Sequence, residues 1–170
     1  MDFYVEKMFG GISMKIFIKK ISEVGTEFKD EMELESFMNN GDELKMLKPV
    51  SFEGVLKKGD DFIEVNGKIS LEYSTFCHLC GTEFSRCDEI EANEVYRREP
   101  TEDEYLLTGD EIELDEMILD NLRLKLPVRF LCKEDCKGVC TRCGKNLNFE
   151  KCECKEEIKV SPFDILKGRM

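Results

Sequence analysis

The chain has 170 residues, of which 41% are hydrophobic, a size and composition suited to one domain or one domain with a small appendage. No run approaches the roughly 18 apolar residues that a membrane span needs. The first twenty residues, "MDFYVEKMFGGISMKIFIKK", lack the basic leader and small-residue cleavage site of a secretory signal. We therefore expect a cytoplasmic protein without a membrane partner.

The formal net charge is −12, and it is concentrated in one stretch. Residues 88–116 contain thirteen acidic side chains and only two basic ones, Arg97 and Arg98, so this stretch carries a charge of −11. An acidic chain lacks the electrostatic footprint of an autonomous nucleic-acid binder. The simplest interpretation of the acidic run is a solvated strand face and a flexible loop. If the protein functions near RNA, we expect it to act through contacts with other proteins or through a small local basic patch.

The N-terminal third gives the weakest signals. We expect residues 1–13 to form a disordered extension. A first strand begins at Met14, with Ile16, Ile18 and Ile21 on its apolar side. Residues 27–43, "EFKDEMELESFMNNGDE", mix helix formers with no clean period, and we predict a short helix that ends near the Asn39-Asn40-Gly41 sequence.

A hairpin signal follows. Residues 50–56 and 62–76 are β-like runs that flank the turn "KKGDD". The second run alternates strictly, which is typical of a half-buried antiparallel strand. Its apolar side holds Ile63, Val65, Ile69, Leu71, Tyr73 and Thr75, and its polar side holds Glu64, Asn66, Lys68, Ser70 and Glu72. This strand leads directly into Cys77, and residues 82–96 predict a returning strand, so the first cysteine pair sits at a hairpin tip.

The rest of the chain predicts a loop and two helices. Residues 97–111 are polar and interrupted by proline, as expected of a mobile loop. Residues 113–127 predict an amphipathic helix that stops at proline, with an apolar face of Leu114, Met117, Ile118, Leu122 and Leu124. Ser161 and Pro162 predict the start of a short terminal helix. The fold class is α+β: a mainly antiparallel β domain (residues 14–131) with one or two packed helices, then a cysteine-rich segment (residues 132–170).

Two cysteine pairs share one local design, "CHLCG" at residues 77–81 and "CTRCG" at residues 140–144. In a reducing cytosol, clustered cysteines bind metal or do redox work more often than they form disulfides. Glycine after a CxxC turn tolerates the positive φ that closes the turn around the sulfurs. Both segments therefore resemble zinc knuckles, each of which supplies half of a four-ligand site.

The spacings of the remaining cysteines complete two sites. Cys140 and Cys143 have local partners in Cys152 and Cys154, whose side chains face the same way in extended chain. The spacing of Cys132 and Cys136 suits one helical turn, and they complement Cys77 and Cys80. These eight cysteines would bind two structural Zn²⁺ ions, with four ligands for each ion. Cys87 is left as a free thiol. One zinc with spare thiols, an iron–sulfur cluster and a redox pair remain alternatives.

Little in the sequence indicates catalysis. The single histidine, His78, lies inside a knuckle, where a surface position is expected. A zinc ion held by four thiolates has no open position for water, which disfavours metal hydrolysis. We predict no enzyme. The basic residues near the cysteines either offset thiolate charge or contact RNA; they are Lys133, Lys137, Arg142, Lys145, Lys151 and Lys155.

Three segments together resemble the large ribosomal RNA subunit accumulation protein family, also called YceD-like: "ELDEMILDNLRLKLPV", "CKEDCKGVCTRCGKNLNFEKCEC" and the closing "SPFDILKGRM". The resemblance implies a non-enzymatic bacterial ribosome-biogenesis factor that supports accumulation or processing of large-subunit (23S) ribosomal RNA. Its partners would be that RNA or pre-ribosomal proteins. One departure is Leu79, where an arginine is usual.

Two other functions remain open. One is a cytoplasmic redox or metal-handling protein with exposed, reactive cysteines. The other is an enzyme that acts on RNA.

Overall fold

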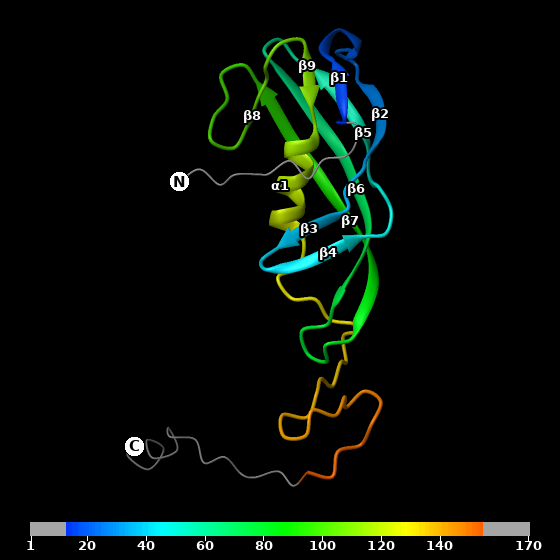
Figure 1. The fold of residues 1–170 in the computed structure, drawn as a ribbon. Helices are drawn as coiled ribbons and strands as arrows, with labels where there is room; N and C mark the ends of the chain where they lie inside the picture. The colour runs from blue at the N-terminus through cyan, green and yellow to red at the C-terminus, as the bar shows by residue number, and fades with distance from the viewer. Residues whose placement is uncertain (1–12, 155–170) are drawn as a thin grey trace, which may run out of the picture.

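Two long strands carry the fold, β6 (Phe62–Phe76) and β7 (Glu83–Arg97), which pair antiparallel along their whole length. The computed structural model describes residues 13–154. Figure 1 shows an elongated molecule in which the β6–β7 hairpin runs from the broad end of the sheet down to a loop-rich end. We call this loop-rich end, residues 131–154, the terminal lobe.

Shorter strands widen the sheet on both sides of the hairpin. The strand order is β2–β5–β6–β4–β3, and β7 pairs with β6 and β8. These strands are β2 (Thr26–Met32), β3 (Ser36–Asn39), β4 (Asp42–Met46), β5 (Val50–Lys58) and β8 (Tyr105–Leu106). A second, two-stranded sheet joins β1 (Lys15–Phe17) to β9 (Glu111–Glu113). All these pairings are antiparallel except β7 with β8, so the mainly antiparallel prediction is confirmed.

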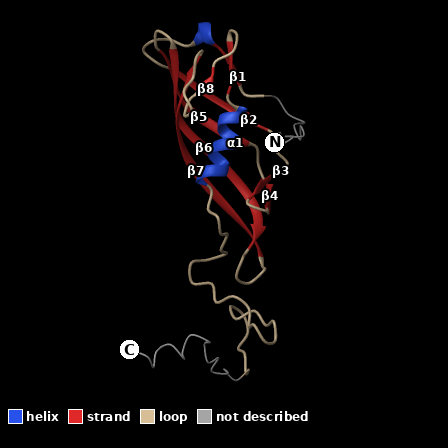
Figure 2. Ribbon diagram, turned by 90° about the vertical axis from the view of Figure 1, so that its left-hand side faces the viewer, coloured by secondary structure: helices blue, strands red, loops and turns tan. Residues whose placement is uncertain are grey.

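One helix packs on the sheet, α1 (Asp115–Lys125), as the amphipathic pattern predicted. Figure 2 shows α1 against one face of the sheet. Side chains of the helix reach β7: Asn121 Nδ2 donates to Glu94 Oε1 (3.0 Å), and Lys125 Nζ donates to the carbonyl of Glu91 (2.6 Å). The assignment of Leu124 to the apolar face was wrong, because this side chain is 80% exposed. It lies two residues from Leu122, and residues two apart do not share a helix face.

The predicted helix over residues 27–43 was wrong, because β2, β3 and β4 occupy this stretch. Backbone pairing with β5 and β6 overrides the helix-forming side chains, as tertiary context often does. Asn40 and Gly41 both have positive φ, 52° and 98°, in the turn between β3 and β4. An Asn-Gly pair is the residue preference of a tight hairpin turn, so this dipeptide marks a hairpin and not a helix end.

The ends of the other predicted segments also shifted. The first strand stops at Phe17, and a 3₁₀ turn, η1 (Ile18–Lys20), replaces its continuation. Ile16 and Ile21 are buried. The predicted loop over residues 97–111 contains β8, where Tyr105 stacks on Tyr96 at 5.2 Å between ring centroids. The predicted terminal helix at Ser161 and the extension over residues 1–12 lie outside the described residues.

No helix within residues 13–154 is long and apolar enough to cross a membrane. The described residues form one hydrophobic core between the sheet, α1 and the β1–β9 pair, and its last member along the chain is Phe130.

Two paired glycines lie in close backbone contact in the core. Gly54 on β5 lies opposite Gly67 on β6, and the Phe52 ring packs over both. A Cβ atom at Gly67 would lie 2.6 Å from the carbonyl oxygen of Glu53 and 2.7 Å from the Gly54 Cα atom. Both neighbours are backbone atoms, so they cannot rotate away as a side chain can.

We expect Gly67→Ala to lower the free energy of unfolding by about 2 kcal/mol, because an added methyl group overpacks the core against fixed backbone. Urea unfolding measures this change. The control Ser70→Ala, on the opposite face of β6, should change stability by less than about 0.5 kcal/mol. Equal stabilities for the two variants would contradict this packing argument.

Candidate metal centres

The two CxxCG segments have the same backbone geometry. In the first, the Gly81 amide donates to the Cys77 carbonyl (2.8 Å) and Gly81 has φ +68°. In the second, the Gly144 amide donates to the Cys140 carbonyl (2.9 Å) and Gly144 has φ +73°. The left-handed conformation favours glycine at both positions. Each turn thus places two sulfurs on one side, as the shared sequence pattern predicted.

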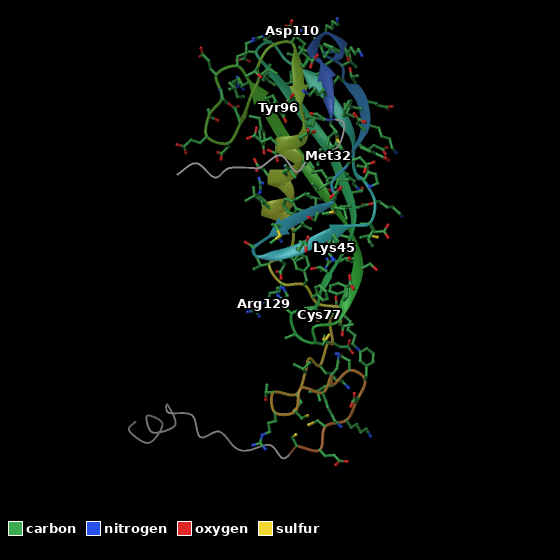
Figure 3. The ribbon with its side chains drawn as sticks, viewed as in Figure 1. Met32, Lys45, Cys77, Tyr96, Asp110 and Arg129 are labelled. Carbon is green, nitrogen blue, oxygen red and sulfur yellow. The ribbon has the colours of Figure 1, made fainter. Side chains whose placement is uncertain are left out.

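The first cysteine group consists of Cys77, Cys80, Cys132 and Cys136, whose sulfur atoms all lie within 4.8 Å of one another. Cys77 Sγ is 3.7 Å from Cys136 Sγ, and Cys80 Sγ is 3.7 Å from Cys132 Sγ. The group joins the tip of the β6–β7 hairpin to the chain that follows α1, and Figure 3 places Cys77 where the sheet narrows into the terminal lobe. Cys77 and Cys80 are both buried.

Aromatic packing supports the first cysteine group from the core side. The His78 amide donates to the carbonyl of Phe130 (2.9 Å), whose ring is fully buried. That ring meets Tyr73 edge-on at 5.9 Å and His78 edge-on at 6.0 Å between centroids. The chain leaving α1 is thereby fixed at Phe130, just before Cys132.

The helical turn that we predicted for Cys132 and Cys136 was wrong. These residues lie in an irregular turn in which the Cys136 amide donates to the Lys133 carbonyl (3.2 Å). The turn still brings both sulfurs to the same side, because a three-residue separation allows a tight reversal as well as a helical turn.

The second cysteine group consists of Cys140, Cys143, Cys152 and Cys154, also within 4.8 Å of one another. Cys143 Sγ is 3.6 Å from Cys152 Sγ, and Cys152 Sγ is 3.3 Å from Cys140 Sγ. None of its members is buried. This group is therefore local in sequence and open to solvent, whereas the first group is anchored on the sheet.

Each group contains thiols with opposed pKa shifts. Burial raises the pKa of Cys77, but backbone amides of Cys132, Cys80 and Leu79 outweigh it and lower that pKa to about 6. Amides of Cys143 and Arg142 lower the pKa of Cys140 to about 6. Burial, followed by the neighbouring sulfurs, raises the pKa of Cys132 to about 12. The sulfurs of Cys152 and Cys143 raise the pKa of Cys154 to about 12.

This pattern fits a site for a cation. Neighbouring sulfurs make ionisation of Cys132 in the first group and of Cys154 in the second costly, and a bound cation would remove that cost. A tetrahedron with metal–sulfur bonds of about 2.3 Å separates its sulfurs by about 3.8 Å, close to the spacings in both groups. All nine cysteines are free thiols. The geometry and the donor set thus fit a thiolate-bound metal ion in each group.

Two other residues singled out in the sequence are not members of either cysteine group. Cys87 is an exposed free thiol on β7, opposite Glu72. The His78 ring points to the sheet, where its Nε2 is 2.9 Å from Asp42 Oδ2.

Sequence reasoning missed two polar residues beside the sulfurs. Thr82 Oγ1 lies 3.4 Å from Cys80 Sγ, and Asn148 Nδ2 lies 3.4 Å from Cys136 Sγ. The position of Thr82 directly after a knuckle glycine is a usable signal. The sequence carries no comparable signal for Asn148.

Fold and site together define a small β protein with two candidate four-thiolate metal centres at one end of its sheet. The model of the family "Large ribosomal RNA subunit accumulation protein YceD" matches residues 65–168, and this chain belongs to that family. The matched range includes all eight cysteines of the two groups. The family resemblance noted in the sequence is thereby confirmed.

Two plant proteins are similar to part of the chain. Each is named "Large ribosomal RNA subunit accumulation protein YCED homolog 1, chloroplastic". The protein from Arabidopsis thaliana is 41% identical over 63 residues, which are 35% of this chain and 20% of the relative. The protein from Zea mays is 37% identical over 59 residues, 34% of this chain and 20% of the relative. The chain thus matches about a fifth of the length of these curated relatives. No solved structure matches the chain significantly.

We expect single cysteine variants to separate the two groups. Cys152→Ser should abolish metal binding at the second group and leave one metal ion at the first, and Cys77→Ser should do the reverse. Metal analysis of the purified variants measures the stoichiometry, with Cys87→Ser as a control that keeps the wild-type content. Loss of all metal from either variant would show that the ligands are shared differently.

Acidification should release bound metal. Because their pKa is lowered to about 6 from an ordinary value of 9.0, Cys77 and Cys140 contribute stability fully above pH 9 and lose it as the pH falls through about 6. Protons then compete with metal for the same sulfurs. A chromogenic chelator should report little release at pH 8 and increasing release below pH 6. Retention that does not change between pH 8 and pH 5 would contradict this expectation.

Proposed function

We propose that this protein is a non-enzymatic ribosome-biogenesis factor that supports accumulation or processing of large-subunit (23S) ribosomal RNA in the bacterial cytoplasm. The observation that carries the proposal is the family match over residues 65–168. The names of the two chloroplast relatives point to the same process.

Both cysteine groups, in this proposal, hold a structural Zn²⁺ ion. Sulfur spacings of 3.3–3.7 Å and the all-cysteine donor set support zinc. A closed four-thiolate site leaves no position for a reacting water, which supports a structural and not a catalytic ion. His78 faces Asp42, so it is not placed as a general base for chemistry at the metal. The ions would hold a recognition surface in shape.

The distribution of charge supports the terminal lobe as the part that works closest to RNA. Residues 88–116 carry a charge of −11 and lie on β7, the β8–β9 region and the start of α1. RNA phosphates are repelled from such a surface. The terminal lobe, at the opposite end of the elongated molecule, is close to neutral before the thiolates are counted. It holds five basic residues (Lys133, Lys137, Arg142, Lys145 and Lys151) and four acidic ones (Glu134, Asp135, Glu150 and Glu153), of which Asp135 pairs with Lys133 and Glu150 with Lys145. We propose that large-subunit RNA or pre-ribosomal proteins meet the molecule there.

One observation favours a second function, a redox or metal-handling protein. Cys143 is exposed, and no member of the second cysteine group is buried, so these thiols are accessible to oxidants when metal is absent. Metal content separates the two functions. Two tightly held zinc ions and one reactive thiol, Cys87, support the structural role, whereas a zinc-free protein with reversible disulfides supports the redox role.

Cells depleted of the protein should contain less large-subunit ribosomal RNA relative to small-subunit ribosomal RNA. The wild-type gene and Cys87→Ser should restore the ratio, whereas a Cys77→Ser, Cys80→Ser double variant should not, because the hairpin tip is released from the terminal lobe. Quantification of both RNAs measures the ratio, and crosslinking in cells identifies RNA attached to the protein. A normal ratio after depletion would contradict the proposed function.

A further inference from the structure

The loop between the two halves of the second cysteine group also contacts the first group. This loop, residues 144–151, begins just after Cys143 and ends just before Cys152. Within this loop, the side chain of Asn148 makes two contacts with residues outside the loop. Asn148 Oδ1 accepts from the Lys137 amide (3.0 Å), and Asn148 Nδ2 donates to Cys136 Sγ (3.4 Å). A residue held between ligands of the second group thus donates directly to a ligand of the first.

A second asparagine fixes the orientation of the first. Asn146 Oδ1 accepts from the backbone amide of Asn148 (3.0 Å) and from Asn148 Nδ2 (2.9 Å). Asn146 Nδ2 in turn donates to Thr82 Oγ1 (3.2 Å), which lies 3.4 Å from Cys80 Sγ. The two amides therefore connect the loop of the second group to two sulfurs of the first group, one from each of its halves.

The chemistry of these contacts favours an ionised, metal-bound sulfur. An N–H donor directed at a thiolate stabilises the negative charge and orients the lone pair that remains for the metal. Removing such a partner of a metal ligand typically lowers metal affinity by about 10–100-fold. The donor can act only while the loop keeps its shape. The loop is flanked at both ends by cysteines of the second group, and its middle is held by the Leu147 amide, which donates to the Gly138 carbonyl (2.9 Å), and by the bridge between Val139 and Asn146.

We propose that the two centres bind metal cooperatively, with Asn148 and Asn146 as positioning residues that carry the coupling. Metal in the second group closes the loop over residues 144–151, and the closed loop presents the Asn148 amide to Cys136. By linkage, metal in the first group favours the same loop shape and strengthens the second centre equally. This coupling rests on the proposed role of both groups as zinc sites.

The two groups also differ in exposure, and this difference sets the order in which metal would be lost. The first group has two buried cysteines on the sheet, so its half-site at the hairpin tip is positioned by the fold. The second group is open to solvent and is held by short-range contacts. Loss of metal from the exposed second centre will therefore weaken the first centre, and with it the attachment of the terminal lobe to the sheet.

The test uses the full-length protein loaded with cadmium-113 and chelator competition for zinc. Two cadmium resonances are assigned with Cys152→Ser and Cys77→Ser. Asn148→Asp keeps an acceptor for the Lys137 amide but removes the donor to Cys136, and uncharged Asn148→Ala shows whether carboxylate repulsion contributes. Glu150→Gln, an exposed and isosteric change in the same loop, is the matched control.

Both Asn148 variants should lower the zinc affinity of the first centre by about 10–100-fold and shift its cadmium resonance, while Glu150→Gln matches the wild type. Cys152→Ser should weaken the first centre similarly, and adding Asn148→Asp to it should have little further effect, because both changes remove the same contact. Equal affinities for Asn148→Ala and Glu150→Gln, or additive effects in the double variant, would overturn the coupling. A wild-type protein that binds neither metal would overturn the proposed zinc sites themselves.

Discussion

The closure of the β6–β7 hairpin tip onto the chain after α1 is the constraint on which the rest of the molecule depends. Cys80 and Cys132 are 52 residues apart in sequence, and Cys77 and Cys136 are 59 apart, yet their sulfurs lie 3.7 Å from one another in each pair. The hydrophobic core ends at Phe130. Beyond it, only Gly138 is buried among residues 131–154. The terminal lobe therefore has no apolar interior. Metal binding by the cysteine thiolates would have to supply the stabilisation that a hydrophobic core gives elsewhere.

The long hairpin makes this closure effective. β6 and β7 are each 15 residues long and pair without interruption from Phe62 opposite Arg97 to Phe76 opposite Glu83. A continuous antiparallel ladder fixes the direction in which the hairpin tip points. The turn that holds Cys77 and Cys80 lies at this tip, so the ladder also sets its orientation. The terminal lobe is then positioned relative to the sheet by the first cysteine group and Phe130, not by packing of its own. A surface formed by the lobe consequently depends on whether its sulfurs are engaged.

Charge separates the two ends of the molecule in the same way. Burial raises the pKa of the Tyr96 and Tyr105 hydroxyls. The next cause is Tyr105 for Tyr96 and Asp120 for Tyr105, and the carboxylates of Glu94 and Glu116 contribute to both. Some of the acids of residues 88–116 have basic partners: Glu104 pairs with Arg97, Asp88 with Arg86 and Glu89 with Lys68. The basic residues of the lobe are correspondingly important, because the thiolate groups beside them are themselves negative. A polyanion would approach the lobe end with less repulsion than the helix end.

The sequence by itself determined the elements whose signal is local. Strict alternation over residues 62–76 defined β6, helical periodicity defined α1, and the demand of a four-coordinate ion for two half-sites divided the eight cysteines into the groups that the structure brings together. The first two signals depend on spacing along one short stretch, and the cysteine grouping combines four pairs that are each local in sequence, so one sequence suffices to read them.

Only the tertiary structure decided what depends on neighbours from elsewhere in the chain. Residues 27–43 became strands because β5 and β6 supply their backbone partners, although their side chains favour a helix. The Asn40-Gly41 dipeptide is itself a hairpin-turn signal, but the helix-forming residues around it led us to interpret it as the end of a helix. The contact between Asn148 and Cys136 spans two cysteine groups, and no spacing rule predicts it. Spacing determines which residues can share a face, but only the folded chain determines which faces meet.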